Sequence, residues 1–165
     1  IRDSIMNMLN QAKRYVYITT PYLIIDNELI EAIEHAAIRG IDVRIITPHI
    51  PDKKLVFRMT RSHYHRLMQA GAKIYEYESG FVHAKVYLSD DETAMVGTIN
   101  MDFRSFFLHF ECATCFYNSS VVASVKQDIL ETINVSRRID DAWLRRVPWL
   151  RSITASVLRL FAPLL

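Results

Sequence analysis

The sequence lacks several features that would assign a common class of function directly. No run of about 18 or more apolar residues is present, so no transmembrane helix is predicted. Neither GxGxxG nor GxxxxGK[ST] occurs, so dinucleotide and P-loop nucleotide sites are not indicated. The 165 residues include two cysteines, Cys112 and Cys115. Their odd spacing on a predicted strand points them to opposite faces, so we expect buried, reduced thiols rather than a disulfide or a metal pair.

Charge is nearly balanced overall but uneven along the chain. The formal net charge is only +2, so composition predicts no strong attraction to nucleic acid. The final segment combines apolar residues with Trp143, Trp149 and six arginines. These arginines are Arg137, Arg138, Arg145, Arg146, Arg151 and Arg159. Such a composition suits contact with an anionic membrane surface, but a C-terminal helix docked on the core would use the same apolar residues.

The order of the predicted elements indicates one α/β domain. Apolar patterning predicts strands near 15–22, 41–48, 72–78, 81–88, 93–98 and 110–117, and helices near 3–11, 26–40, 51–71 and 119–134. Strands and helices alternate at first, whereas the later strands follow one another closely. We therefore expect a mixed, partly parallel sheet flanked by helices on both faces. This domain should span 1–135, followed by a basic, apolar helical extension over 136–165.

The stretch FVHAKVYLSDDETAMVGTIN carries the polar residues that an anion site needs. Residues i and i+2 of a strand point the same way, so His83 and Lys85 should share one face. A buried lysine without a partner is costly, so this face should meet an anion. Thr98 and Asn100 follow Gly97, which allows the backbone to approach a ligand closely. These groups suit a phosphate, and histidine adds a nucleophile that also exchanges protons near neutral pH.

Six polar or glycine positions in this region follow the spacing HxKxxxxDxxxxxxG[ST]xN. They are His83, Lys85, Asp90, Gly97, Thr98 and Asn100. This spacing resembles the signature of the phospholipase D superfamily. Longer segments resemble bacterial cardiolipin synthases: TPYLIIDNELIEAI is similar to their TPYF-x-PDE segment, ESGFVHAK to GF[LV]HAK, and GTINMDFRSFFLHFE to GSxNMDxRSFxLNFE. The resemblance covers nearly all of the chain and corresponds to the C-terminal half of such an enzyme.

The resemblance implies a role for each of these residues. His83 would be one of two catalytic histidines, either the nucleophile or the general acid, and the family favours the acid for this copy. Lys85 and Asn100 would bind phosphoryl oxygens with help from Thr98. Glu111 stands where the family has a carboxylate that orients the histidine. Neither a metal nor another cofactor is implied, because the lysine and the carboxamide can stabilise the charge of the transition state.

Other positions are further candidates or depart from the family pattern. Thr98 replaces the usual Ser and keeps its hydroxyl, and His109 replaces the usual Asn. Asp90 belongs to the signature but follows the strand, so we expect it to pair within the turn rather than touch substrate. Tyr22, at a strand end, is a candidate for lining the pocket. Arg104 could reach an anionic substrate or form a surface ion pair.

The family mechanism needs two histidines from two copies of the motif, and this sequence has one copy. The first hypothesis is therefore the C-terminal catalytic half of a cardiolipin synthase. It would transfer a phosphatidyl group from phosphatidylglycerol, release glycerol and pass through a phosphohistidine. Because the sequence begins with Ile1, we expect an N-terminal half with the second motif, or a second copy in a homodimer. The enzyme would belong to the bacterial inner membrane, with the C-terminal basic and tryptophan-containing segment on the lipid.

Two alternatives stay open. The chain could be a single-motif phosphodiesterase or nuclease that acts as a homodimer, although its nearly neutral charge favours no nucleic-acid partner. It could also be a non-enzymatic domain that binds lipid or a protein, although the complete motif argues against the loss of catalysis.

Overall fold

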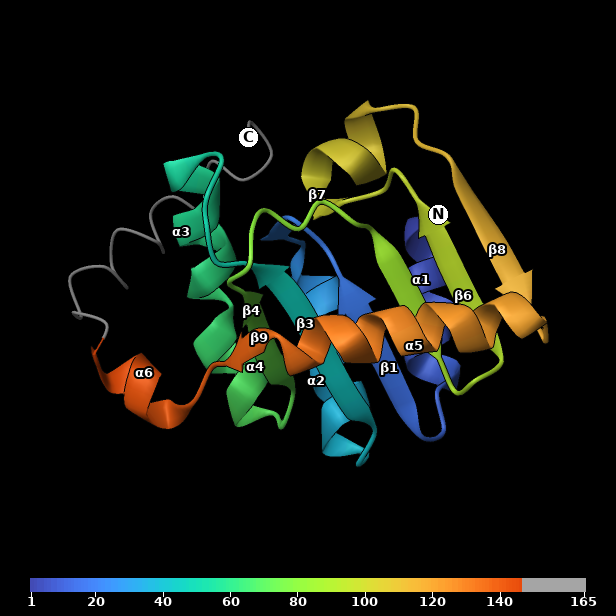
Figure 1. The fold of residues 1–165 in the computed structure, drawn as a ribbon, viewed down its shortest axis with the longest axis horizontal. Coiled ribbons are helices and arrows are strands. Elements are labelled where there is room, and N and C mark those ends of the chain that lie inside the picture. The colour runs from blue at the N-terminus through green and yellow to red at the C-terminus, as the bar shows by residue number, and fades with distance from the viewer. Residues whose placement is uncertain (147–165) are drawn as a thin grey trace.

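The computed structural model describes residues 1–146 and shows a mixed sheet between two layers of helices (Figure 1). Seven strands form the main sheet in the order β8-β6-β5-β1-β3-β4-β9. They are β1 (Tyr15–Thr19), β3 (Asp42–Pro48), β4 (Lys73–Tyr77), β5 (Val86–Ser89), β6 (Thr93–Gly97), β8 (Ala113–Tyr117) and β9 (Ser136–Arg138). Strands β1, β3 and β4 are parallel, and the others pair antiparallel with their neighbours. The predicted mixed, partly parallel sheet is confirmed.

Helices cover both faces of this sheet, as predicted. They are α1 (Arg2–Gln11), α2 (Asn27–Ile38), α3 (Lys54–Ser62), α4 (Tyr64–Gln69), α5 (Ser120–Asn134) and α6 (Asp141–Arg146). Helix α5 crosses one face, where Val122, Ile129 and Ile133 pack against the strands (Figure 1). Helices α1, α2 and α4 cover the other face and contribute to the larger apolar core. Because helices cover both faces, all five residues of β1 are buried.

The helix predicted over 51–71 is two helices, α3 and α4, separated at His63. The hydroxyl of Ser62 donates to the carbonyl of Met59 at 2.6 Å, and the His63 N–H donates to Thr60 only three residues back. These bonds tighten the last turn of α3 and end it. The uniform helical pattern of the sequence conceals this local change.

The strand predicted over 81–88 begins only at Val86. Its neighbour β1 ends at Thr19, and Pro21 follows shortly, with no N–H to donate. Residues 81–85 therefore have no strand beside them on that side and form a coil. His83 and Lys85 accordingly belong to a loop at the sheet edge, not to the face of a strand.

A second, two-stranded sheet stands beyond the end of β1. It pairs β2 (Leu23–Ile24) in parallel with β7 (Met101–Asp102). The buried Thr20 hydroxyl links the two segments, because it accepts from the Met101 N–H at 3.1 Å and donates to the Tyr22 carbonyl at 2.7 Å. The chain after β6 is thereby held beside the chain after β1. A π-helical turn, η1 (Arg104–Leu108), follows β7.

The segment from residue 136 does not begin as a separate extension. Strand β9 pairs with β4 at the edge of the main sheet, and Ile139 is buried in the core. The rest of the predicted extension, residues 147–165, lies outside the described residues. No helix within residues 1–146 is both long and apolar enough to span a bilayer.

The two cysteines are free but exposed, so the prediction of burial is wrong. Cys112 precedes β8 instead of lying on it, and β8 is an edge strand with a partly exposed face. Apolar patterning does not reveal that a strand lies at the edge.

Candidate active site

His83 and Lys85 lie in the coil between β4 and β5, at the sheet edge where the parallel strands end (Figure 1). Lys85 Nζ lies 3.0 Å from both ring nitrogens of His83 and donates to the His83 carbonyl at 2.7 Å. Lys85 is buried, whereas His83 is exposed. The i, i+2 spacing thus brings the two side chains together even without a regular strand.

The electrostatics of this pair favour an incoming anion. Partial burial and then the charge of Lys85 lower the pKa of His83, while Asp52 opposes the shift. Burial also lowers the pKa of Lys85, against the carboxylates of Glu111 and Asp102. An ordinary histidine titrates near pH ~6.5, so these shifts favour the neutral imidazole at pH 7. The Lys85 ammonium forms no direct ion pair with a described residue, so a phosphoryl group would supply a close counter-charge.

Thr98 and Glu111 form the neighbouring part of the site. The Thr98 hydroxyl donates to the Glu111 carboxylate and accepts from the Cys112 N–H at 3.1 Å. The Ser105 hydroxyl donates to the other Glu111 oxygen at 3.0 Å and accepts from the Asn100 N–H at 3.2 Å. One carboxylate therefore holds the segment after β6 against the turn η1.

Asn100 presents a side-chain group that the protein does not satisfy. Its Oδ1 atom is buried, and no residue in the described part of the chain hydrogen-bonds to it. A buried polar atom left unpaired costs about 1–3 kcal/mol. Oδ1 only accepts hydrogen bonds, so a ligand hydroxyl would relieve this cost, whereas the predicted bond to a phosphoryl oxygen requires the Nδ2 N–H groups of Asn100.

Gly97 lies where β6 packs closely against the backbone before and at the start of β8. A Cβ at this position would lie 2.2 Å from the Cys112 carbonyl oxygen and 2.6 Å from Ala113 Cα. The Gly97 N–H donates to the Lys85 carbonyl at 3.2 Å on the other side. Glycine therefore permits β6 to pack directly against the backbone of Cys112 and Ala113, next to Glu111, while it bonds to Lys85 on its other side.

Glu111 does not contact His83 directly in this structure. Its hydrogen-bond partners are Thr98 and Ser105, and its closest imidazole is that of His109, with Nδ1 3.9 Å from Oε1. The resemblance implies that a carboxylate orients the histidine. Here Glu111 instead orients the hydroxyl of Thr98 and influences the pKa of Lys85.

Tyr22 and Asp52 form a pair that the sequence reasoning identified only in part. The Tyr22 hydroxyl donates to the Asp52 carboxylate, and burial followed by this bond raises the pKa of Tyr22. The charge of Asp52 partly opposes the lowering of the His83 pKa. In the sequence, only the place of Asp52 after Pro51, at a predicted helix start, indicated this residue.

Arg104, the other candidate for reaching substrate, is exposed in η1 and forms no ion pair with a described residue.

Asp90 lies at the opposite end of β5 from Lys85. Its carboxylate accepts three backbone hydrogen bonds, from Lys13 at 2.7 Å and from Arg14 and Tyr15 at 2.9 Å. Burial opposes ionisation, but these three donors hold the pKa of Asp90 below its usual value. The prediction that Asp90 pairs within its own turn is wrong about the partners, because the carboxylate binds the backbone that leads into β1.

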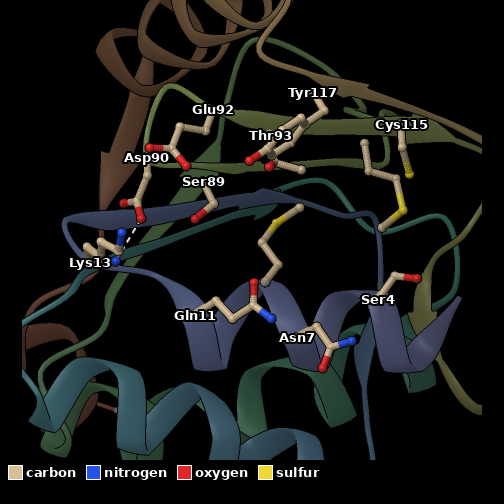
Figure 2. A pocket seen from close by; sticks show the side chains of 12 residues that line it. Ser4, Asn7, Gln11, Lys13, Ser89, Asp90, Glu92, Thr93, Cys115 and Tyr117 are labelled. Atoms are coloured by element: carbon tan, nitrogen blue, oxygen red, sulfur yellow. Dashed lines mark hydrogen bonds between the residues drawn. The ribbon is translucent and has the colours of Figure 1, made fainter.

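A cavity of about 660 Å³ lies between α1 and the strands β5, β6 and β8 (Figure 2). Ser4, Asn7 and Gln11 line it from the helix, and Thr93 and Tyr117 from the sheet. The cavity lies at the end of β5 that carries Asp90. None of the other motif residues lines it, so it is separate from the site around His83.

Comparisons with known proteins place the chain among phospholipase D-like domains. A protein of Streptococcus mutans is 48% identical over 160 residues, covering 97% of this chain and 35% of that protein. The cardiolipin synthase of Geobacillus kaustophilus is 41% identical over 165 residues, covering all of this chain and 33% of the synthase. The chain thus spans about a third of the length of these relatives.

Two solved structures share the fold at low sequence identity. Nuc of Salmonella typhimurium, a phospholipase D family member, aligns with TM-score 0.74 and 18% identity, over 85% of this chain and 91% of Nuc. Phosphatidylserine synthase of Haemophilus influenzae aligns with TM-score 0.73 and 16% identity, over 98% of this chain and 44% of the synthase. The model of the family described as "Cardiolipin synthase, PLD-like domain" matches residues 5–133. The chain therefore belongs to this family of phospholipase D-like domains.

Proposed function

We propose that this chain is the C-terminal catalytic half of a cardiolipin synthase and transfers a phosphatidyl group from phosphatidylglycerol. The observation that carries this proposal is the contact between Lys85 and His83, with Thr98 and Asn100 following β6 at the same edge. An ammonium, an imidazole, a hydroxyl and a carboxamide together suit a phosphodiester anion.

The reaction proceeds in two displacements at phosphorus. In the first, a histidine nitrogen attacks, the N–P bond forms, and the bond from phosphorus to the glycerol oxygen breaks. A second histidine donates a proton to the departing glycerol. In the second, a hydroxyl of another phosphatidylglycerol gives its proton to that second histidine and attacks phosphorus. The N–P bond breaks, and cardiolipin and free nucleophilic histidine are formed.

His83 supplies one of these two histidines. Its lowered pKa favours the neutral form before substrate binds, which suits a nucleophile or a base. A bound phosphodiester would offset the Lys85 charge and raise the pKa of His83, which suits the general acid. His83 can therefore serve in either position, and the family resemblance favours the acid.

The second histidine must come from outside this chain. The relatives named cardiolipin synthase are about three times as long as the matched region. This length leaves room for an upstream half with the second motif, and a homodimer is the other source. Such an enzyme would associate with the bacterial inner membrane, where its lipid substrates are. Within the basic C-terminal segment that would touch lipid, Trp143 packs on the core, and residues 147–165 lie outside the described residues.

The experiment compares the chain alone with the chain joined to an upstream half that carries a second motif. Labelled phosphatidylglycerol is the substrate, and labelled cardiolipin and free glycerol are measured. We expect equal amounts of both products from the joined protein and none from the monomeric chain alone. Equal turnover by the monomeric chain alone, or no cardiolipin from the joined protein, would refute the proposal.

A homodimeric phosphodiesterase or nuclease is the second candidate. The observation in its favour is that the fold of this chain covers 91% of Nuc, so the fold also occurs as nearly an entire chain. The diagnostic measurement is cleavage of DNA by the purified chain at several salt concentrations. Cleavage that declines steeply with salt, with a dimer in solution, would favour this candidate over the synthase.

A further inference from the structure

Exposed apolar side chains gather in three segments around the candidate active site. Ile50 and Leu55 flank the start of α3, Phe81 precedes His83, and η1 and the residues just after it carry a third group. The exposed members of that third group are Phe107, at 57%, Leu108, at 64%, and Phe110, which is fully exposed. The start of α3, the coil before β5 and η1 all lie along the upper edge of the molecule in Figure 1. We call these six residues the apolar rim.

Ring contacts connect the rim to the site and to the body of the protein. The Phe81 ring stacks on the His83 imidazole, with centroids 5.6 Å apart and planes inclined by 27°. The Phe107 ring lies 5.3 Å from that of Phe103. Phe103 in turn packs against the cluster of Ile24, Val56 and Met59. The apolar rim therefore contacts the buried cluster through Phe103 and contacts His83 through Phe81.

Basic side chains without carboxylate partners accompany the rim. Lys54 and Arg58 on α3 and Arg104 on η1 are exposed and form no ion pair with any residue that the structure describes. Some basic residues elsewhere are paired, such as Arg66 with Glu34 at 2.6 Å and Lys73 with Asp42 at 2.6 Å, whereas Lys13, Arg39 and Arg138 form no ion pair with a described residue. Free positive charge is thus available beside the apolar side chains.

We propose that the apolar rim and its three free basic residues form a surface that docks on an anionic phospholipid bilayer. This proposal rests on the proposed function, because it places the site against its lipid substrate. Apolar side chains enter the boundary between headgroups and acyl chains, while Lys and Arg remain at the level of the phosphates. His83, in contact with Phe81, would then lie near the depth at which headgroup phosphates are found.

A protein partner fits this composition less well. Lysine is depleted at protein interfaces, although arginine and phenylalanine are enriched there, so Lys54 argues against a protein partner. Here Lys54 and Arg58 lie within one turn of the exposed Leu55. Basic and apolar residues mixed in this way, next to a site for a phosphodiester, are typical of a surface that lies on anionic lipid. The half that supplies the second histidine must then approach His83 without covering the rim.

The test measures binding of the 165-residue chain to phosphatidylglycerol–phosphatidylcholine vesicles, with pure phosphatidylcholine vesicles for comparison. One variant combines Phe107→Ser and Leu108→Ser, and another carries Arg58→Glu. The matched controls are Ile38→Ser, at a residue 69% exposed on α2, and Lys13→Glu, at an exposed residue just before β1, beside Asp90 and away from His83. Circular dichroism and the urea midpoint show whether each variant folds.

We expect the double variant to lower the vesicle partition coefficient at least about tenfold, because two large apolar side chains no longer enter the bilayer. Arg58→Glu should lower it at least about fivefold at low salt, with a smaller effect at high salt. The controls should remain within about twofold of the original chain. Unchanged binding by both rim variants, or equal losses in the controls, would overturn the proposal.

A third result would also overturn it. The rim variants could bind vesicles normally but fail to associate with the half that carries the second motif, or with a second copy. The rim would then be a protein interface. Vesicle binding requires no turnover. If the joined protein formed no cardiolipin while the chain still bound vesicles through the rim, the proposed function would be refuted and the docking surface would not.

Discussion

Asp90 is the motif residue for which a structural role can be distinguished most clearly from a role in the reaction. The perturbation is Asp90→Ala. The buried carboxylate accepts three backbone hydrogen bonds, from the N–H groups of Lys13, Arg14 and Tyr15. Hydrogen bonds to a charged group contribute about 1.5–3 kcal/mol each, but their effects are not additive and water can reach some of the freed N–H groups. The residue also has a left-handed φ of 56°, which alanine adopts at a cost of roughly 1 kcal/mol.

We therefore expect Asp90→Ala to lower the free energy of unfolding by about 3–4 kcal/mol. Asp90→Asn is the matched control, because asparagine tolerates the left-handed conformation and keeps one acceptor oxygen. It should retain the bonds from Arg14 and Tyr15 and lose the one from Lys13, with a loss of about half that size. Urea denaturation followed by circular dichroism measures both values.

The same carboxylate predicts a dependence on pH. The folded-state pKa of Asp90 is lowered, so its contribution to stability is complete above the unfolded-state pKa of about 3.9. As the pH falls through the lower folded-state value, the contribution is lost. The difference in stability between the original chain and Asp90→Ala should therefore be constant near neutral pH and should shrink below about pH 4. A loss of less than about 1 kcal/mol, or abolished turnover in a fully stable variant, would refute a structural role.

Three further substitutions test the geometry of the site. Gly97→Ala should lower the unfolding free energy by about 1–3 kcal/mol, measured in urea, because its Cβ would overlap the chain at Cys112; a neutral effect would contradict the close approach. Lys85→Gln should raise the pKa of His83 toward ~6.5 in an NMR titration, and an unchanged value would show that the lysine charge does not act on the ring. Glu111→Gln should reduce kcat more than stability, because the amide keeps its packing but cannot hold the Thr98 hydroxyl as a carboxylate does; equal activity would exclude this role.

Sequence patterning predicted the features of this fold that depend on neighbouring residues. The contact between His83 and Lys85 follows from their i, i+2 spacing, and it forms even though the local backbone is a coil. The helix predicted from residue 26 begins there, and Asp26 caps α2 by accepting from the Leu29 N–H at 2.9 Å. Such features are local, so periodicity and capping rules are sufficient to predict them.

Features that depend on distant segments could not be predicted in the same way. The coil at His83 results from the end of β1, more than sixty positions earlier, and not from its own residues. Strand β9 forms because the edge of β4 is available, whereas its own sequence, rich in arginine, indicates an exposed segment. Asp52 approaches the site from the loop before α3, and no motif position marks it. Each depends on tertiary packing, which overrides local propensity.

Cardiolipin formation by a His83→Ala variant of the chain joined to its second motif tests the central claim most directly. His35→Ala, at an exposed histidine on α2, is the matched control. We expect the His83 variant to fold normally and to lose phosphatidyl transfer by at least about a thousandfold, because no other described residue can replace its imidazole. The control should retain full turnover. Transfer within tenfold of the unaltered protein in a folded His83→Ala variant would contradict the assignment of this residue as catalytic.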